Sequence, residues 1–168
     1  IRPHLLGQTI ECLVVRNPRL RWPVPPGLPA VLQGGRIAAL TRRGKYLLMQ
    51  VIRASDGAAW PPAGGDVPYR QHDGSAGFAT ADAGSAGTLL FHLGMSGSLR
   101  ITEAATPPRK HDHYDLRLPG GLCLRFHDPR RFGCLLWTEA DPSQHPLLAS
   151  LGPEPLEAGF DGAHLHRL

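Results

Sequence analysis

The sequence has 168 residues, 42% of them hydrophobic, with a formal net charge of +4 and an isoelectric point near 9.3. This length favours one domain with a substantial core, and no apolar run approaches the ~20 residues that a membrane-spanning helix needs, so we expect no membrane partner. The three cysteines, Cys12, Cys123 and Cys134, lack metal-ligand spacing. We expect buried, reduced thiols rather than a disulfide framework or a metal cluster.

The first third of the chain predicts short elements joined by turns. Alternating, β-branched residues predict a strand over Thr9–Val15, and Leu28–Gln33 predicts a short helix that ends at Gly34-Gly35. Two further strands are expected over Arg36–Arg43 and Lys45–Ile52, and they meet at Gly44.

Residues 52–87 differ in composition from the rest of the chain. They are mostly Ala, Gly, Pro, Ser and Asp, with few side chains to bury. Two arginines against four aspartates give the segment a net charge of −2, which leaves +6 for the remainder of a chain whose total is +4. We expect a flexible surface insertion that joins two strands.

Strand patterns return after the insertion. They cover Thr88–Leu93, Ser98–Ile101, Tyr114–Leu118, Leu122–Phe126 and Cys134–Thr138. Pro119-Gly120-Gly121 is typical of a hairpin turn, and a short helical run is expected near Leu147–Leu151. About eight strands with few helices predict a mainly β protein, either a sandwich or a barrel.

Four short segments place unusual side chains beside turn residues. In Arg42–Leu47, three cations surround a glycine bend and favour either a phosphate-contacting corner with Lys45 near a reacting sugar, or a solvated strand end. In His92–Ser98, Met95 lies between two glycines, where a flexible apolar side chain can enter a base stack or fold back over the core. Composition alone favours the simpler structural alternative in both segments.

The other two segments lie further along the chain. Lys110–Asp115 carries His111 and His113, which alternate along an expected strand and favour phosphate contact over a metal site, because no further ligand spacing accompanies them. Asp128–Gly133 begins with the turn pair Asp-Pro and ends with Gly, with Arg130 and Phe132 between them. This composition suits a base-stacking, phosphate-binding loop and, equally, a turn whose ring packs inward.

All four segments occur in one basic, β-rich chain, and this combination favours nucleic acid as the partner. An enzyme that acts on a base in duplex DNA must extrude that base and hold the resulting void open. An apolar side chain, an aromatic ring and a hydrogen-bonding plug suit this task. Met95, Phe132 and Arg130 are side chains of these three types.

Six segments, in order, resemble the N-terminal domain of the bacterial formamidopyrimidine-DNA glycosylase family. They are VVRNPRLRWPV (14–24), RRGKYLL (42–48), HLGMSGSLRI (92–101), PPRKHDHYDL (107–116), DPRRFG (128–133) and HPLLASLGPEPL (145–156). The resemblance implies a two-layered β-sandwich of about eight strands with flanking short helices. It places this domain at 1–156, with the insertion at 52–87 and the start of a linker at 157–168.

The resemblance also implies a function in base-excision repair. The family removes oxidised purines such as 8-oxoguanine and formamidopyrimidines from duplex DNA and then nicks the abasic site by β,δ-elimination. By this resemblance, Lys45 serves elimination and phosphate contact, Met95, Arg130 and Phe132 fill the void, and His111 and His92 contact DNA. The void-filling residues resemble the purine branch more than the endonuclease VIII branch, which prefers oxidised pyrimidines.

Some parts of the family's catalytic apparatus fall outside these 168 residues. The family's N-terminal proline is the nucleophile, the following glutamate is the acid, and a C-terminal zinc finger holds one structural zinc. Because Ile1 matches a position beyond that start, we expect a fragment that is inactive alone and contains no metal. We expect the whole protein to be a monomeric cytoplasmic enzyme bound to bacterial DNA; the alternatives are a non-catalytic damaged-DNA-binding module or a structural β-domain.

Overall fold

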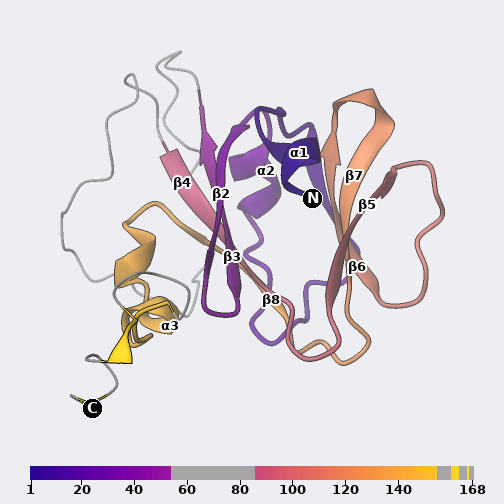
Figure 1. Cartoon of the computed structure of the whole chain (residues 1–168). Helices are drawn as coiled ribbons and strands as arrows, with labels where there is room; N and C mark the ends of the chain where they lie inside the picture. The colour runs from indigo at the N-terminus through magenta and orange to yellow at the C-terminus, as the bar shows by residue number, and fades with distance from the viewer. Residues whose placement is uncertain (54–85, 155–159, 163–165, 167–168) are drawn as a thin grey trace.

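The described residues form two four-stranded antiparallel sheets that lie face to face, as the computed structural model in Figure 1 shows. The structure describes residues 1–53, 86–154, 160–162 and 166. One sheet has the order β2-β3-β4-β8 and the other the order β1-β6-β7-β5. The strands are β1 (Cys12–Val15), β2 (Arg36–Arg43), β3 (Tyr46–Ile52), β4 (Ala86–His92), β5 (Ser98–Glu103), β6 (Asp112–Leu118), β7 (Leu122–His127) and β8 (Cys134–Thr138).

The helices are short and lie around the sandwich. The helices with described bounds are α1 (Arg2–Leu5), α2 (Leu28–Leu32) and α3 (Pro146–Ala149), with 3-10 turns η1 (Pro119–Gly121) and η2 (Pro142–Gln144). The sequence predicts α2 and α3 to within two residues but does not predict α1, because one helical turn is too short to show periodicity.

The prediction of a mainly β, two-layered sandwich is confirmed, and the strands differ from expectation mainly at their ends. β2 and β8 have the predicted bounds, whereas β1 is shorter because Thr9 forms only an isolated bridge to Arg36. Ile52 and Ala86 are partners in the β3–β4 ladder, so the strands continue into both ends of the predicted 52–87 insertion. The rest of that insertion, 54–85, lies outside the described residues.

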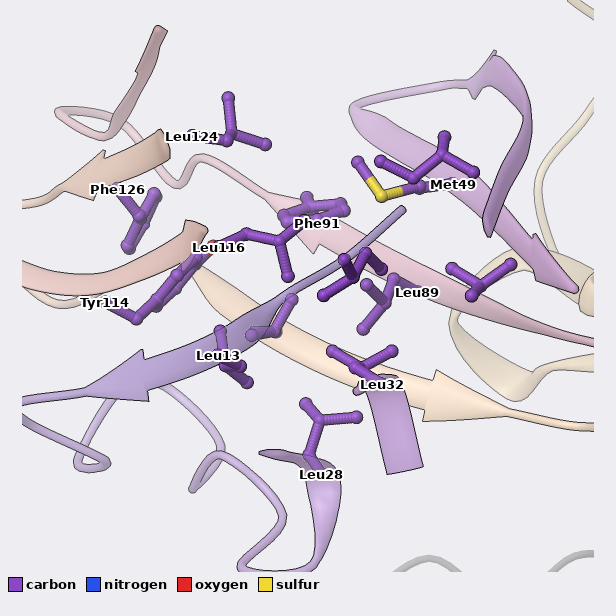
Figure 2. Close-up of a cluster of buried hydrophobic side chains, with 14 of the residues drawn as sticks. Leu13, Leu28, Leu32, Met49, Leu89, Phe91, Tyr114, Leu116, Leu124 and Phe126 are labelled. Carbon is purple, nitrogen blue, oxygen red and sulfur yellow. The ribbon is translucent and has the colours of Figure 1, made fainter. Parts of the chain in front are cut away.

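The core lies between the sheets, and both sheets contribute to it (Figure 2). Met49, Leu89 and Phe91 come from β3 and β4, and they face side chains of the other sheet, such as Leu116. Tyr114 and Phe126 stack at 4.8 Å between ring centroids. Each fully buried side chain of this size contributes roughly 1.5–3 kcal/mol. This packing makes the sandwich a fixed frame for its connecting loops.

The free cysteines agree only in part with the prediction of buried thiols. Each lies on a strand, and Cys123 and Cys134 are buried, but Cys12 is half-buried at the start of β1. Burial raises the pKa of the Cys134 thiol to about 12. This thiol is therefore protonated near neutral pH and packs as a small apolar group.

Strand directions bring the unusual segments to one edge of the sandwich. The antiparallel ladders place the end of β2 beside the start of β3, the end of β4 beside the start of β8, and the end of β7 beside the start of β5. The connections 93–97 and 128–133 each cross between the two sheets at this edge, and the β2–β3 turn lies there too (Figure 1). The sequence segments around Lys45, Met95 and Arg130 therefore become neighbours.

Candidate nucleic-acid interface

An open hollow of about 770 Å³ lies at this edge of the sandwich. Its lining comes from four separate parts of the chain and is cationic and apolar. The lining residues are Arg19, Leu20, Arg21, Lys45, His92, Gly94, Met95, Arg130, Arg131 and Phe132. The hollow thus unites Lys45 and His92 with the three predicted void-filling residues.

The connection 93–97 presents Met95 to solvent. Gly94 has a φ of +64°, and a Cβ at this position would lie 2.8 Å from the Phe132 carbonyl carbon. Only glycine allows the two loops to approach so closely. The side chain that follows, Met95, is 77% exposed, so it does not fold back over the core.

The 128–133 loop is organised by its own first residue. The Asp128 carboxylate is fully buried and accepts hydrogen bonds from the Gly133 N–H at 2.8 Å and from the Arg130 N–H at 3.2 Å. It also accepts one from the Ser96 hydroxyl at 2.8 Å, which ties the Met95 connection to this loop. Burial raises the pKa of Asp128, but these bonds outweigh it and the net shift is downward.

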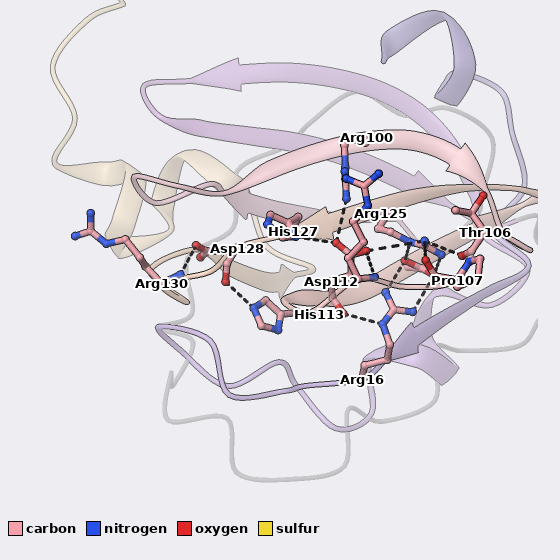
Figure 3. Close-up of polar contacts among 12 residues, drawn as sticks. Arg16, Arg100, Thr106, Pro107, Asp112, His113, Arg125, His127, Asp128 and Arg130 are labelled. Carbon is pink, nitrogen blue, oxygen red and sulfur yellow. Dashed lines mark hydrogen bonds and ion pairs between the residues drawn. The ribbon is translucent and has the colours of Figure 1, made fainter.

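The loop holds Arg130 and Phe132 outward and against each other. The Arg130 guanidinium lies 4.6 Å from the centre of the Phe132 ring, and its terminal nitrogen lies 3.5 Å from the Met95 sulfur. Figure 3 shows the Arg130 side chain pointing away from the ion pairs of the sheet. Phe132 is 45% exposed, so the alternative of an inward-packed ring is wrong. The three side chains therefore form one cluster.

The cations of the β2–β3 turn divide into two groups. Arg42 and Arg43 are paired with the buried Glu154, at 2.9 Å and 3.2 Å between nitrogen and oxygen. Lys45 is exposed and lines the hollow. The two arginines, which the sequence left between a phosphate-contacting corner and a solvated strand end, are thus ion-paired to a carboxylate distant in sequence, and phosphate contact by this segment stays a prediction.

His92 lies at the back of the hollow, at the end of β4. Its Nδ1 accepts a hydrogen bond from the Gly94 N–H at 3.0 Å, and its ring lies 4.9 Å from the Tyr46 ring. Burial, and then the nearby positive charge of Arg21, lower the pKa of His92. A hydrogen bond with the Phe132 backbone raises the pKa by less. A neutral His92 ring whose Nδ1 accepts carries its proton on Nε2, so Nε2 is a donor.

His111 does not line the hollow, and its expected place on a strand is wrong. It precedes β6 with a φ of +74°, and a shift in the β6–β7 register follows between Asp112 and Tyr114. His113, which was expected to share a strand face with His111, is buried, and its Nε2 lies 2.7 Å from the Asp128 carbonyl oxygen. Of the two, only His111 is partly exposed at the same edge.

Arg19 and Arg21 line the hollow, although the sequence did not single them out as site residues. Leu20 between them is buried and fixes the segment, and the Arg21 N–H donates to the Gly133 carbonyl oxygen at 3.1 Å. The Arg21 guanidinium lies 4.7 Å over the Trp22 ring. The sequence Arg-Leu-Arg gives no local signal for this position, because only the fold brings the two arginines to the hollow.

Other arginines of the sandwich are part of its frame. Asp115 is fully buried and binds both Arg16 and Arg125 through paired hydrogen bonds of 2.7–2.9 Å. Burial raises the pKa of Asp115, but the two guanidinium groups outweigh it and hold the pKa at about 2. Nearby, Asp112 binds Arg100 and the His127 ring.

Within the described ranges, no group of three or more His, Cys, Asp and Glu side chains is placed to hold a metal ion. In the same ranges, no helix is long and apolar enough to cross a membrane.

The model of the formamidopyrimidine-DNA glycosylase N-terminal domain matches residues 1–135. The chain belongs to this family. Lys45, His92, Met95, His111, Arg130 and Phe132 lie inside the matched residues, whereas Glu154 lies beyond them.

Relatives in the family match the chain along its whole length. The formamidopyrimidine-DNA glycosylase of Methylococcus capsulatus is 50% identical over 100% of this chain and 50% of its own, and that of Nitrosococcus oceani is 44% identical over 99% of this chain and 49% of its own. The chain spans about half the length of the curated relatives that it matches.

Two solved structures of the family share the fold. The MutM (Fpg) protein of Thermus thermophilus aligns with a TM-score of 0.63 and 32% identity over 99% of this chain and 47% of its own. The Lactococcus lactis glycosylase, solved with DNA that contains an abasic site, aligns with a TM-score of 0.69 and 24% identity over 98% of this chain and 51% of its own.

Proposed function

We propose that this chain forms the N-terminal half of a base-excision-repair DNA glycosylase and abasic-site lyase. Its substrates are oxidised purines, such as 8-oxoguanine and formamidopyrimidines, in duplex DNA. Membership of the family and relatives solved with damaged DNA support this proposal. The whole protein acts as a monomer, and a structural zinc belongs to residues outside these 168.

The observation that carries the proposal is the cluster of Met95, Arg130 and Phe132 beside Lys45 in one hollow. A thioether and an aromatic ring exposed at 77% and 45% are poorly placed for stability, because exposed apolar area gains nothing from folding. Both are well placed to fill the void left by an extruded base. Arg130 adds hydrogen-bond donors for the base opposite the lesion.

The reaction is a substitution followed by eliminations. A secondary amine, which is the family's N-terminal proline and lies outside this chain, attacks the sugar C1′ as the bond to the base breaks. The base leaves with the bonding electron pair and takes up a proton. The amine nitrogen loses its proton, the C1′–O4′ bond breaks as O4′ takes up a proton, and the nitrogen lone pair forms the C1′=N⁺ bond of an iminium ion. Loss of a C2′ proton then expels the 3′ phosphate, and loss of a C4′ proton expels the 5′ phosphate.

The residues of this chain hold the DNA for these steps. Lys45 is exposed at the rim of the hollow and contacts the phosphate beside the reacting sugar, where its charge favours departure of the phosphate anion. His92 donates from Nε2 to a phosphate of the same strand. His111, at the same edge but outside the hollow, contacts the backbone further along the duplex.

The experiment compares two methionines in the full-length protein on a duplex that contains 8-oxoguanine. Met95→Ala is expected to lower single-turnover base excision by 10-fold or more and to leave the free energy of unfolding within about 0.5 kcal/mol, because Met95 is exposed. The control Met49→Ala truncates a fully buried side chain and is expected to cost about 2–5 kcal/mol of stability. Unchanged excision by a folded Met95→Ala protein would remove Met95 from the void-filling role.

A further inference from the structure

We propose that Glu154 is a positioning residue that fixes the turn carrying Lys45. Its carboxylate accepts a hydrogen bond from the Gly44 N–H, and it pairs with Arg42 and Arg43. This inference rests on the proposed function, because it assigns Glu154 a role through Lys45. Glu154 does not line the hollow, so it acts through the turn and not on DNA.

The turn needs an acceptor from outside the hairpin. Arg43 and Tyr46 are ladder partners, so Gly44 and Lys45 form a two-residue connection, and the Gly44 φ of +56° suits the first position of a tight hairpin turn. The N–H of that first position is not used by the ladder, and Gly44 is half-buried, so a protein acceptor there replaces water. Glu154, which is only 6% exposed, supplies that acceptor.

The turn also needs a negative charge. Arg42 and Arg43 stand immediately before Gly44-Lys45, so three cations lie within four residues. The hydrogen bond from the Gly44 N–H and the two arginines lower the pKa of Glu154, which keeps it ionised near neutral pH. With both guanidinium groups held by Glu154, Lys45 is the one cation of this segment that lines the hollow.

The segment that carries Glu154 lies against the turn over several residues. The Leu151 carbonyl oxygen accepts a hydrogen bond from Arg43 at 2.7 Å, and the Leu151 Cδ1 lies 3.1 Å from where a Cβ on Gly44 would stand. The contact joins positions 110 residues apart and brings in a residue beyond the part matched by the family's domain model. The geometry of Lys45 therefore depends on the chain after the sandwich.

The test is a double-mutant cycle in the full-length protein on an abasic-site duplex, with single-turnover strand nicking as the readout. Glu154→Gln keeps an oxygen for the Gly44 N–H but removes the charge, and Glu154→Ala removes both. We expect each to lower the nicking rate, Glu154→Ala by about 10- to 100-fold, because small misplacements of a catalytic group cost this much. In a Lys45→Ala background, Glu154→Ala is expected to change the remaining rate less than about twofold.

Controls separate positioning from general stability. Glu103→Gln removes an equivalent charge from an exposed site on β5 and is expected to leave nicking unchanged. Circular dichroism checks that each variant is folded. If Glu154→Ala is unfolded, Glu154→Gln takes its place in the double-mutant cycle. The inference would be overturned if the Glu154 substitution lowered the nicking rate by the same factor in the wild-type and the Lys45→Ala backgrounds. It would also be overturned if Glu154→Ala nicked normally while Lys45→Ala was impaired. If Lys45→Ala itself nicks normally, the proposed role of Lys45 fails first.

Discussion

The 128–133 loop and the β2–β3 turn both carry basic residues to the same hollow, but different carboxylates organise them. Asp128 lies within its own loop and binds backbone N–H groups and Ser96, so the side chains of Arg130 and Arg131 remain at the hollow. Glu154 comes from a distant segment and binds the side chains of Arg42 and Arg43. On the proposed function, the 128–133 loop offers its arginine side chains to DNA, whereas Glu154 holds those of the β2–β3 turn, so a basic motif in the sequence does not by itself predict which cations are available.

The largest effect is expected from removing the carboxylate of the loop. Asp128→Ala leaves buried N–H donors without an acceptor and is expected to lower the free energy of unfolding by roughly 2–4 kcal/mol. Asp141→Ala is the matched control, since Asp141 also caps its own turn, through the Ser143 N–H at 2.9 Å, but in an exposed site. We expect it to cost about 1 kcal/mol. Equal losses in urea unfolding would contradict the burial argument.

Lowering the pH is expected to remove the contribution that the charged Asp115 makes to the free energy of unfolding. The folded pKa of Asp115 is about 2, below the ordinary value of 3.8, so its contribution is complete above pH 4 and is lost as the pH falls through 2. A shift of this size corresponds to about 2 kcal/mol. Urea unfolding between pH 5 and pH 2 should therefore bring wild type and Asp115→Asn closer together by about this amount. A constant difference would show that the Arg16 and Arg125 pairs do not stabilise the fold through this charge.

The smallest effect distinguishes an arginine that has no ion pair among the described residues from one that has such a pair. Arg21→Ala removes a cation that lines the hollow, whereas Arg42→Ala removes one that Glu154 binds. In DNA binding by the full-length protein, Arg21→Ala is expected to reduce the slope of log K against log salt by about one, the value for one phosphate contact. Arg42→Ala is expected to leave the slope unchanged. The same change of slope in both variants would contradict the proposed difference between Arg21 and Arg42.

The sequence predicted well the features that depend on neighbouring residues. Alternation gave most strands to within a few residues, and the Asp-Pro and Gly at the ends of 128–133 indicated a turn. These signals are local, because a strand or a turn is determined by residues close together in the chain.

The features that escaped prediction depend on distant partners. Nothing near Arg42 and Arg43 indicates that Glu154 binds them, and His111 leaves the expected strand because of the irregular register between β6 and β7. The exposure of Phe132 stayed open for the same reason, since a ring beside a turn packs inward or outward according to what the other sheet presents. Arg19 and Arg21 were missed because only the fold brings them to the hollow.

Borohydride trapping tests the proposed function most directly. The full-length protein is incubated with a duplex that contains 8-oxoguanine, and the iminium ion is reduced to a stable covalent adduct. We expect an adduct with the damaged duplex and none with an undamaged duplex of the same sequence. A folded protein that binds the damaged duplex but forms no adduct would contradict the glycosylase and lyase assignment and would favour a damaged-DNA-binding module.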